Sequence, residues 1–375
     1  MIPFRSSPGT VGIELELQLL DADSLDLCDK VIPLMELVGE SPYIRPESIQ
    51  NTIEVSSRVS RSALECRAHL RQVTRRVADA CERLGLSLCG AGTHPFCERL
   101  ATITPLPRYQ SIEDRAGILG HTQITFATHV HLGMSSGDEA MTFMRELKGF
   151  LPVLIAMSAS SPFWRGRATG FVSYRHRILA AARSYGIPPS FETWADFCNF
   201  YEASVHAGLF RTIKDVHWDI RPHPDFGTVE VRVMDAQPTI ERAAGLAAFL
   251  RGLQRYLSRT PALDRPSALP QRLPWWTEKD NHFQASRLGL DAPYIVSASG
   301  SVRPLRTLVD AAMAASRLAL ADDASDDTSL LHAEPPSGAQ RLVYERTGST
   351  KAVTASLRDQ LADELATDVE SDTAS

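Results

Sequence analysis

The feature that most constrains this chain is a strict alternation of apolar and polar residues in Ile13-Glu-Leu-Glu-Leu-Gln-Leu. Because successive side chains on a strand point to opposite faces, this pattern predicts a β-strand with one buried face. The polar face of that strand carries Glu14, Glu16 and Gln18. We therefore expect a sheet with the hydrophobic core on one side and a surface bearing carboxylates on the other.

Further segments predict the rest of the fold. Strands are expected at 51–56, 86–91, 128–133, 216–221 and 228–234, the last two forming a hairpin with a long loop. Helical spacing and capping residues predict helices at 62–84, 137–158, 239–257, 304–320 and 352–365. Strands and helices do not alternate regularly along the chain. This order favours an α+β fold, an antiparallel sheet with helices packed on one face, over a doubly wound fold.

The polar sides of five predicted strands carry ionisable groups that could face a single surface. These are Glu14, Glu16, Glu54, His129, His131, His217, Asp219, Glu230 and Arg232. An ordinary solvated face would explain polar residues, but it normally includes lysine, which is absent from all five strands. Crowded carboxylates repel one another unless a cation or an arginine lies among them. The pattern therefore favours a site for a hard divalent ion, Mg²⁺ or Mn²⁺, which prefers oxygen ligands.

For single residues, the choice between a binding role and a structural role differs from one residue to the next. His129 and His217 fit a hydrogen-bonded structural role as well as metal ligation, whereas His131 is favoured as a ligand because Gly133 beside it could leave room for a bound group. Arg165 and Arg167 lie in a Pro- and Gly-flanked loop. They could bind phosphate or carboxylate in bidentate fashion, or belong to an ordinary exposed loop.

Composition excludes several classes of function. The 39 basic and 45 acidic residues give a net charge of -6, so no basic field would attract nucleic acid. The longest apolar run, 150–157, falls far short of the ~20 residues needed to cross a membrane. Six scattered cysteines suggest neither a zinc site nor a disulfide framework. We expect a cytoplasmic enzyme that acts on small molecules.

Five motifs occur in an order that resembles a known family. They are Val11-Gly-Ile-Glu-Leu-Glu-Leu-Gln-Leu, Thr128-His-Val-His-Leu-Gly, Ser161-Pro-Phe-Trp-Arg-Gly-Arg, His223-Pro-Asp-Phe-Gly-Thr-Val-Glu-Val-Arg-Val and Asp235-Ala-Gln-Pro-Thr. Together they resemble the bacterial glutamate–cysteine ligase type 2 family, the YbdK-like carboxylate–amine ligases. The resemblance runs from the first strand to the late helices.

The resemblance implies a glutamine-synthetase-like catalytic fold, in which a curved antiparallel sheet holds ATP and Mg²⁺ or Mn²⁺ on its concave face. It implies one ligase domain over residues 1–366, and we expect 367–375 to be a disordered acidic tail. The implied reaction joins glutamate to cysteine or another amine through a γ-glutamyl phosphate, with release of ADP and phosphate, as in glutathione-type biosynthesis. The activity with cysteine could be weak, and a homodimer is compatible with this picture.

Matching motif positions implies site residues. Glu16, Glu54, His131 and Glu230 would bind metal, with Glu14 as a further ligand. Arg232 and Arg165 would contact phosphate or the substrate carboxylate, and Arg167, Asn281 and Arg287 would bind substrate. Family members tend to carry an arginine where this chain has His282. The resemblance therefore leaves open which amine is the acceptor.

Two other classes of function remain open from the sequence. A His-x-His pair with nearby acids is also how metal-dependent amide hydrolases hold metal. In those enzymes, however, the pair lies on an early strand of a parallel barrel. A protein that binds a nucleotide or an amino acid without catalysis is the third reading.

Overall fold

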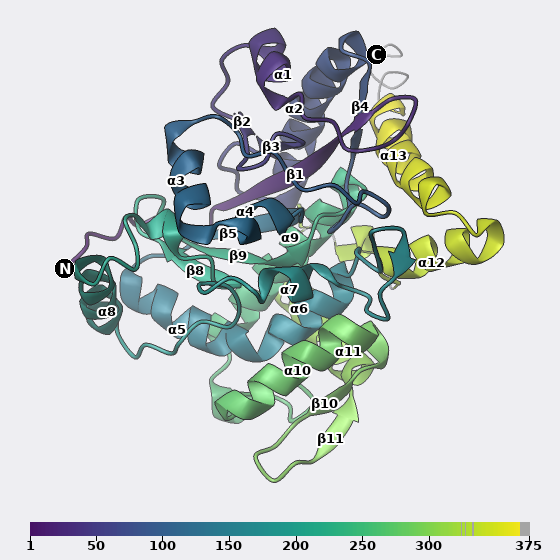
Figure 1. The fold of residues 1–375 in the computed structure, drawn as a ribbon. Helices are drawn as coiled ribbons and strands as arrows, with labels where there is room; N and C mark the ends of the chain where they lie inside the picture. Colours follow the sequence, from purple (N-terminus) through teal and green to yellow (C-terminus); the bar gives the residue numbers. More distant parts are fainter. Residues whose placement is uncertain (324, 327, 332–333, 368–375) are drawn as a thin grey trace.

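The computed structural model describes residues 1–323, 325–326, 328–331 and 334–367, apart from the side chains of 111–113 and 330. Its centre is a seven-stranded antiparallel sheet (Figure 1). Six strands follow the order β2 (Ile44–Pro46), β3 (Thr52–Ser56), β1 (Val11–Asp21), β5 (Ala127–Gly133), β9 (Thr228–Asp235) and β8 (Ile220–His223). β4 (Leu86–Cys89) pairs with the far end of β1. The α+β fold with an antiparallel sheet is confirmed. Most of the predicted tail, 368–375, lies outside the described residues.

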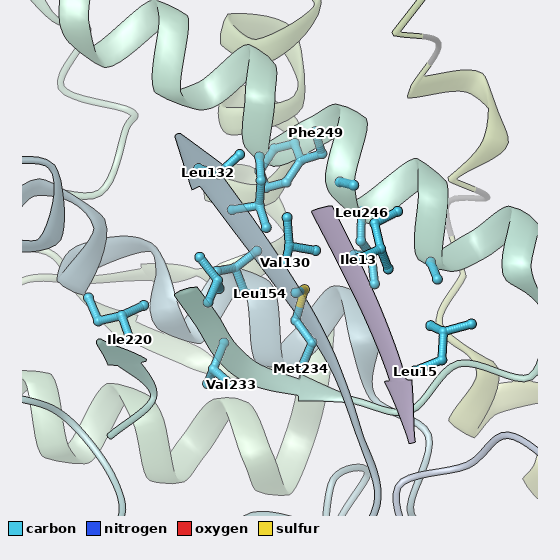
Figure 2. Packing of buried hydrophobic residues seen from close by; sticks show 14 of the residues in the cluster. Ile13, Leu15, Val130, Leu132, Leu154, Ile220, Val233, Met234, Leu246 and Phe249 are labelled. Atoms are coloured by element: carbon cyan, nitrogen blue, oxygen red, sulfur yellow. The ribbon is translucent and has the colours of Figure 1, made fainter. Parts of the chain in front are cut away.

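The apolar face of the sheet packs against helices. Figure 2 shows Ile13 and Leu132 of the sheet beside Leu246 and Phe249 of α9 (Ile240–Arg259). These residues are at most 1% exposed. The same face is also covered by α2 (Ala63–Arg83) and α6 (Leu151–Ser158), and α11 (Leu305–Ala319) packs on α9 from outside. The alternation along β1 thus fixes which face meets the helices, as the sequence predicted.

The remaining elements surround this centre. The longer helices are α1 (Val31–Val38), α3 (Pro107–Ala116), α5 (Gly137–Leu147), α8 (Trp194–His206), α10 (Trp275–Leu288), α12 (Pro336–Thr347) and α13 (Thr350–Ala366). Shorter pieces are α4 (Ile118–Thr122) and α7 (Arg175–Leu179). There are also two small hairpins, β6 (Phe163–Trp164) with β7 (Arg167–Ala168) and β10 (Pro293–Ile295) with β11 (Val302–Pro304). Among the described residues, no helix is long and apolar enough to cross a membrane.

Several details differ from the sequence expectations. The strand predicted over 216–221 begins only at Ile220, where β8 starts, so 216–219 precede it. The helix predicted over 137–158 is divided into α5 and α6 by a 3₁₀ turn at 148–150, with Pro152 in the first turn of α6, where its missing N–H costs nothing. Gly133 does not make room for a ligand. A Cβ there would come within 1.8 Å of the Ser7 carbonyl oxygen, so the glycine admits the N-terminal segment instead.

His94 is a buried histidine outside the polar face of the sheet. It lies in the loop after β4, where its Nδ1 accepts a hydrogen bond from the Cys97 backbone N–H at 2.9 Å and its Nε2 is 3.0 Å from the Leu25 carbonyl oxygen. Burial lowers the pKa of His94 to about 4. The neutral ring is therefore part of the packed structure.

We predict that His94 makes the fold sensitive to mild acid. The unfolded chain takes up a proton near pH 6.5 and the folded chain only near pH 4, so stability is complete above pH 6.5 and falls as the pH drops toward 4. Between pH 7 and pH 5 the loss amounts to about 2 kcal/mol. Urea denaturation should show a smaller fall over this range for His94→Gln than for the wild type. Equal falls would mean that His94 does not carry the effect.

Candidate active site

The polar face of the sheet forms the floor of a cavity of about 770 Å³. Eight of the nine ionisable residues expected on one surface line this cavity. They are Glu14, Glu16, Glu54, His129, His131, His217, Glu230 and Arg232. The ninth, Asp219, is not among the described lining residues and lies elsewhere. A cavity of this size is in the range of small-molecule sites.

Strand register explains why these side chains meet. Glu14 on β1 pairs with His129 on β5, and His131 pairs with Glu230 on β9. On the other edge of β1, Glu16 pairs with Glu54 of β3. Cross-strand partners point to the same face of a sheet. The register thus gathers four carboxylates and two imidazoles that are far apart in the sequence.

Three of these groups have ligand atoms close enough to bind one ion. Atoms of Glu14, His131 and Glu230 lie within 4.8 Å of one another. Nε2 of His131 is 3.4 Å from a Glu14 oxygen and has no well-aligned hydrogen-bond partner, while its Nδ1 is 3.0 Å from the Thr228 hydroxyl. A buried nitrogen oriented in this way, beside two carboxylates, fits a bound cation. The donor set therefore suits a divalent metal.

Glu230 is almost fully buried between two arginines. Nε of Arg221 donates to its Oε2 at 2.6 Å, and Arg232 donates to its Oε1. Burial opposes the charge of Glu230, but Arg221 and Arg232 lower its pKa well below the usual value. The carboxylate is therefore ionised and compensated without a metal. Arg221 was not predicted as a site residue, although its spacing from Asp219 and His223 puts it on the polar face of β8.

The charges of Glu16 and Glu54 are compensated only in part. Burial, followed by repulsion from Glu47, raises the pKa of Glu16 to about 7. Burial and the charge of Glu14 raise the pKa of Glu54 well above its usual value. Glu14 differs from both, because His131 and His129 lower its pKa despite its burial. The cavity floor thus has an excess of carboxylates that a bound cation would offset.

Basic residues line other parts of the cavity wall. Arg108 and Arg115 come from α3, Arg45 from β2, Arg183 from the loop after α7, and Lys214 from the 3₁₀ turn at 213–215. Arg115 also forms an ion pair with Asp215 at 3.2 Å, which joins α3 to the 213–215 turn. The cavity therefore combines acidic and basic linings, an arrangement that suits a metal–phosphate group. No periodic pattern in the sequence predicted that these residues would line a site.

Four residues predicted to bind substrate lie apart from the described lining of this cavity. Arg165 and Arg167 lie in the turn and second strand of the β6–β7 hairpin, where Arg165 has a φ of 49° and stacks over Trp164. Arg287 lines a separate pocket of about 240 Å³. Asn281 is buried and bonds the backbone N–H and carbonyl of Ile295. Their roles toward substrate stay predictions.

Solved structures share this fold over nearly the whole chain. Glutamate–cysteine ligase from Francisella tularensis, solved in complex with AMP, has a TM-score of 0.65 and 13% identity, covering 99% of this chain and 95% of that one. The bifunctional glutathione synthetase from Pasteurella multocida has a TM-score of 0.64 and 13% identity, covering 95% of this chain and 52% of that one. The predicted glutamine-synthetase-like catalytic fold is confirmed. At 13% identity these likenesses concern the fold alone.

The sequence comparisons give the family. Residues 10–363 match the family described as glutamate-cysteine ligase family 2, GCS2. A Trichormus variabilis protein provisionally named glutamate–cysteine ligase 2 is 45% identical over 97% of this chain and 96% of its own length. A Thermobifida fusca protein with the same provisional name is 34% identical over 93% of this chain and 90% of its own. The chain belongs to glutamate-cysteine ligase family 2, as its motifs predicted, and is thus of the class of ligases that form a carbon–nitrogen bond.

The site predicts different stability effects for two conservative changes. Glu230→Gln leaves Arg221 and Arg232 buried without their counter-charge, so the free energy of unfolding should fall by about 3 kcal/mol or more. Glu54→Gln relieves repulsion among carboxylates and should leave stability unchanged or raise it. Urea denaturation in the presence of a chelator measures both. An equally large loss for Glu54→Gln would contradict the charge balance described here.

Proposed function

We propose that this protein is an ATP- and Mg²⁺-dependent carboxylate–amine ligase that joins the γ-carboxylate of glutamate to an amine, with cysteine as one acceptor. The observation that carries the proposal is a cavity in which a carboxylate-rich floor meets basic walls. Membership in glutamate-cysteine ligase family 2 supports the glutamate substrate. The free thiols of all six cysteines agree with a reducing cytoplasmic compartment.

The proposed reaction has two steps. A carboxylate oxygen of glutamate attacks the γ-phosphorus of ATP, a P–O bond forms, and ADP leaves. The amine then attacks the acyl carbon, a C–N bond forms, and phosphate departs with that carboxylate oxygen while the nitrogen loses a proton. A free carboxylate resists attack by an amine because it is negatively charged and has a poor leaving group. Phosphorylation removes both obstacles.

Different residues of the cavity would bind the metal ions and the anionic groups of the substrates. Glu14, Glu16, Glu54, His131 and Glu230 would hold the divalent ions, which offset negative charge during phosphoryl transfer when they are bound. Arg232, fixed by Glu230, would present a guanidinium to a phosphate or to the glutamate carboxylate. Arg45, Arg108 and Lys214 on the walls would orient the remaining anionic groups. Positioning and electrostatics would supply most of the catalysis.

We predict ADP release that requires both glutamate and an amine. A coupled assay with ATP and Mg²⁺ should show turnover with glutamate plus cysteine or another amine from a panel, and none when glutamate is omitted. With glutamate labelled with ¹⁸O in its γ-carboxylate, one labelled oxygen should appear in the released phosphate. ADP formation at the same rate without glutamate, or phosphate without label, would refute the proposed function.

Glu54→Gln should reduce turnover by at least about 100-fold, equivalent to about 2.7 kcal/mol of transition-state stabilisation, because it removes a negative charge that would hold the metal. The matched control is Glu40→Gln, an exposed acid remote from the cavity lining, which should keep full activity. Circular dichroism should be unchanged for both variants. Full activity of Glu54→Gln would remove this residue from the proposed metal site.

A further inference from the structure

A second cluster of ligand-type side chains lies outside the described lining of the cavity. It contains His176 of α7, Asp219 just before β8 and His282 of α10, and it is 5–7% exposed. One ligand atom from each residue lies within 4.8 Å of those from the other two. Nε2 of His282 is 3.0 Å from an oxygen of Asp219, and the two imidazole rings meet edge to face with centroids 4.9 Å apart.

His176 has an unused ligand atom. Its Nε2 is buried and has no hydrogen-bond partner, which is costly unless something binds there. Burial, the neighbouring His282 and the charges of Arg175 and Arg177 lower the pKa of His176 well below its usual value, although a backbone hydrogen bond at Val233 opposes this. The imidazole is therefore neutral, the form that binds a metal.

Two hydrogen bonds fix the backbone of Asp219, the residue that supplies the carboxylate of this cluster. The Asp219 N–H donates to the Gly186 carbonyl at 2.9 Å, and the Asp219 carbonyl accepts from the Arg232 N–H at 2.7 Å. Arg177 could compete with a metal ion for Asp219, because the carboxylate stabilises the charged form of the arginine. The guanidinium of Arg177, however, lies over the ring of Phe283. The carboxylate can thus face His176 and His282 together.

We propose that His176, Asp219 and His282 form a binding site for a divalent transition metal such as Zn²⁺, separate from the Mg²⁺ site of the cavity. Two imidazoles and one carboxylate are ligands that Zn²⁺ favours, whereas Mg²⁺ prefers oxygen. Zn–N and Zn–O bonds of about 2.0–2.2 Å need only modest contraction of the cluster. The ion would displace the proton between His282 and Asp219 and would fill the empty position at His176. A water molecule could complete a four-coordinate site.

Such an ion would act mainly on the architecture. It would link α7 and α10 to Asp219 at the edge of the main sheet. The carbonyl of Asp219 accepts a hydrogen bond from the Arg232 backbone N–H. Metal binding that depends on the folded arrangement adds to folding stability. We therefore expect Zn²⁺ to raise the melting temperature through this cluster.

The test measures bound zinc and does not depend on catalysis. Because the acidic cavity could also bind Zn²⁺ through His131, the measurement uses the full chain carrying His131→Gln, dialysed against Zn²⁺ with excess Mg²⁺ and then against zinc-free buffer. We expect about one equivalent of zinc to remain, and we expect adding His176→Gln to remove it. The control His206→Gln, which changes an exposed histidine at the end of α8, should retain the zinc.

His282→Gln is a second variant that guards against misfolding, because a glutamine amide can still donate to Asp219. It should also lose the zinc while circular dichroism stays native, and the zinc-dependent rise in melting temperature should vanish with it. In the same measurement without the His131→Gln change, the wild type should retain one equivalent of zinc more than His176→Gln. Equal zinc content with and without His176, or no zinc in His131→Gln, would overturn the proposal, whatever the ligase assay shows.

Discussion

The structure depends on the balance of charge on one face of its central sheet. Burying several carboxylates together is unfavourable unless opposite charges lie among them. Arg221 and Arg232 compensate Glu230, and His131 stabilises the charged form of Glu14. Glu16 and Glu54 receive too little compensation to stay fully ionised. A bound cation would offset the negative charge that Glu16 and Glu54 carry when they are ionised.

The same strands supply both the hydrophobic core and the site. Ile13 and Leu15 of β1 and Val231 and Val233 of β9 are buried in the core. The residues that line the cavity come from between or beside them, Glu14 and Glu16 on β1 and Glu230 and Arg232 on β9. A slip of one residue in the register would place Ile13 in the cavity and Glu14 in the core. The packing of Phe249 and Leu246 against the apolar face therefore also fixes where the carboxylates point (Figure 2). Stability and site geometry have one origin.

The sequence predicted those features that a local pattern encodes. Alternation identified β1, β3, β5 and β9 and the side chains that their polar faces would share. Arg108 and Arg115 on α3 could not be foreseen, because nothing in their local sequence says that this helix lies over the sheet. Asp219 shows the limit of periodicity: it has the spacing of a cavity residue, yet it lies at the strand end, where His282 holds its carboxylate. Contacts between residues far apart in the sequence determine where these side chains lie, and a local pattern does not encode such contacts.

The charge of the proposed substrates would account for acidic and basic linings occurring together. ATP and glutamate, the substrates we propose, are both anionic, so the acidic floor by itself would repel them. Cations held by the floor would reverse its effective charge, and the arginines and lysine of the walls would attract the remaining phosphate and carboxylate groups. Binding of the nucleotide should therefore follow or accompany metal binding. A floor of neutral residues would avoid the repulsion, but it could not hold the ions that offset charge during phosphoryl transfer.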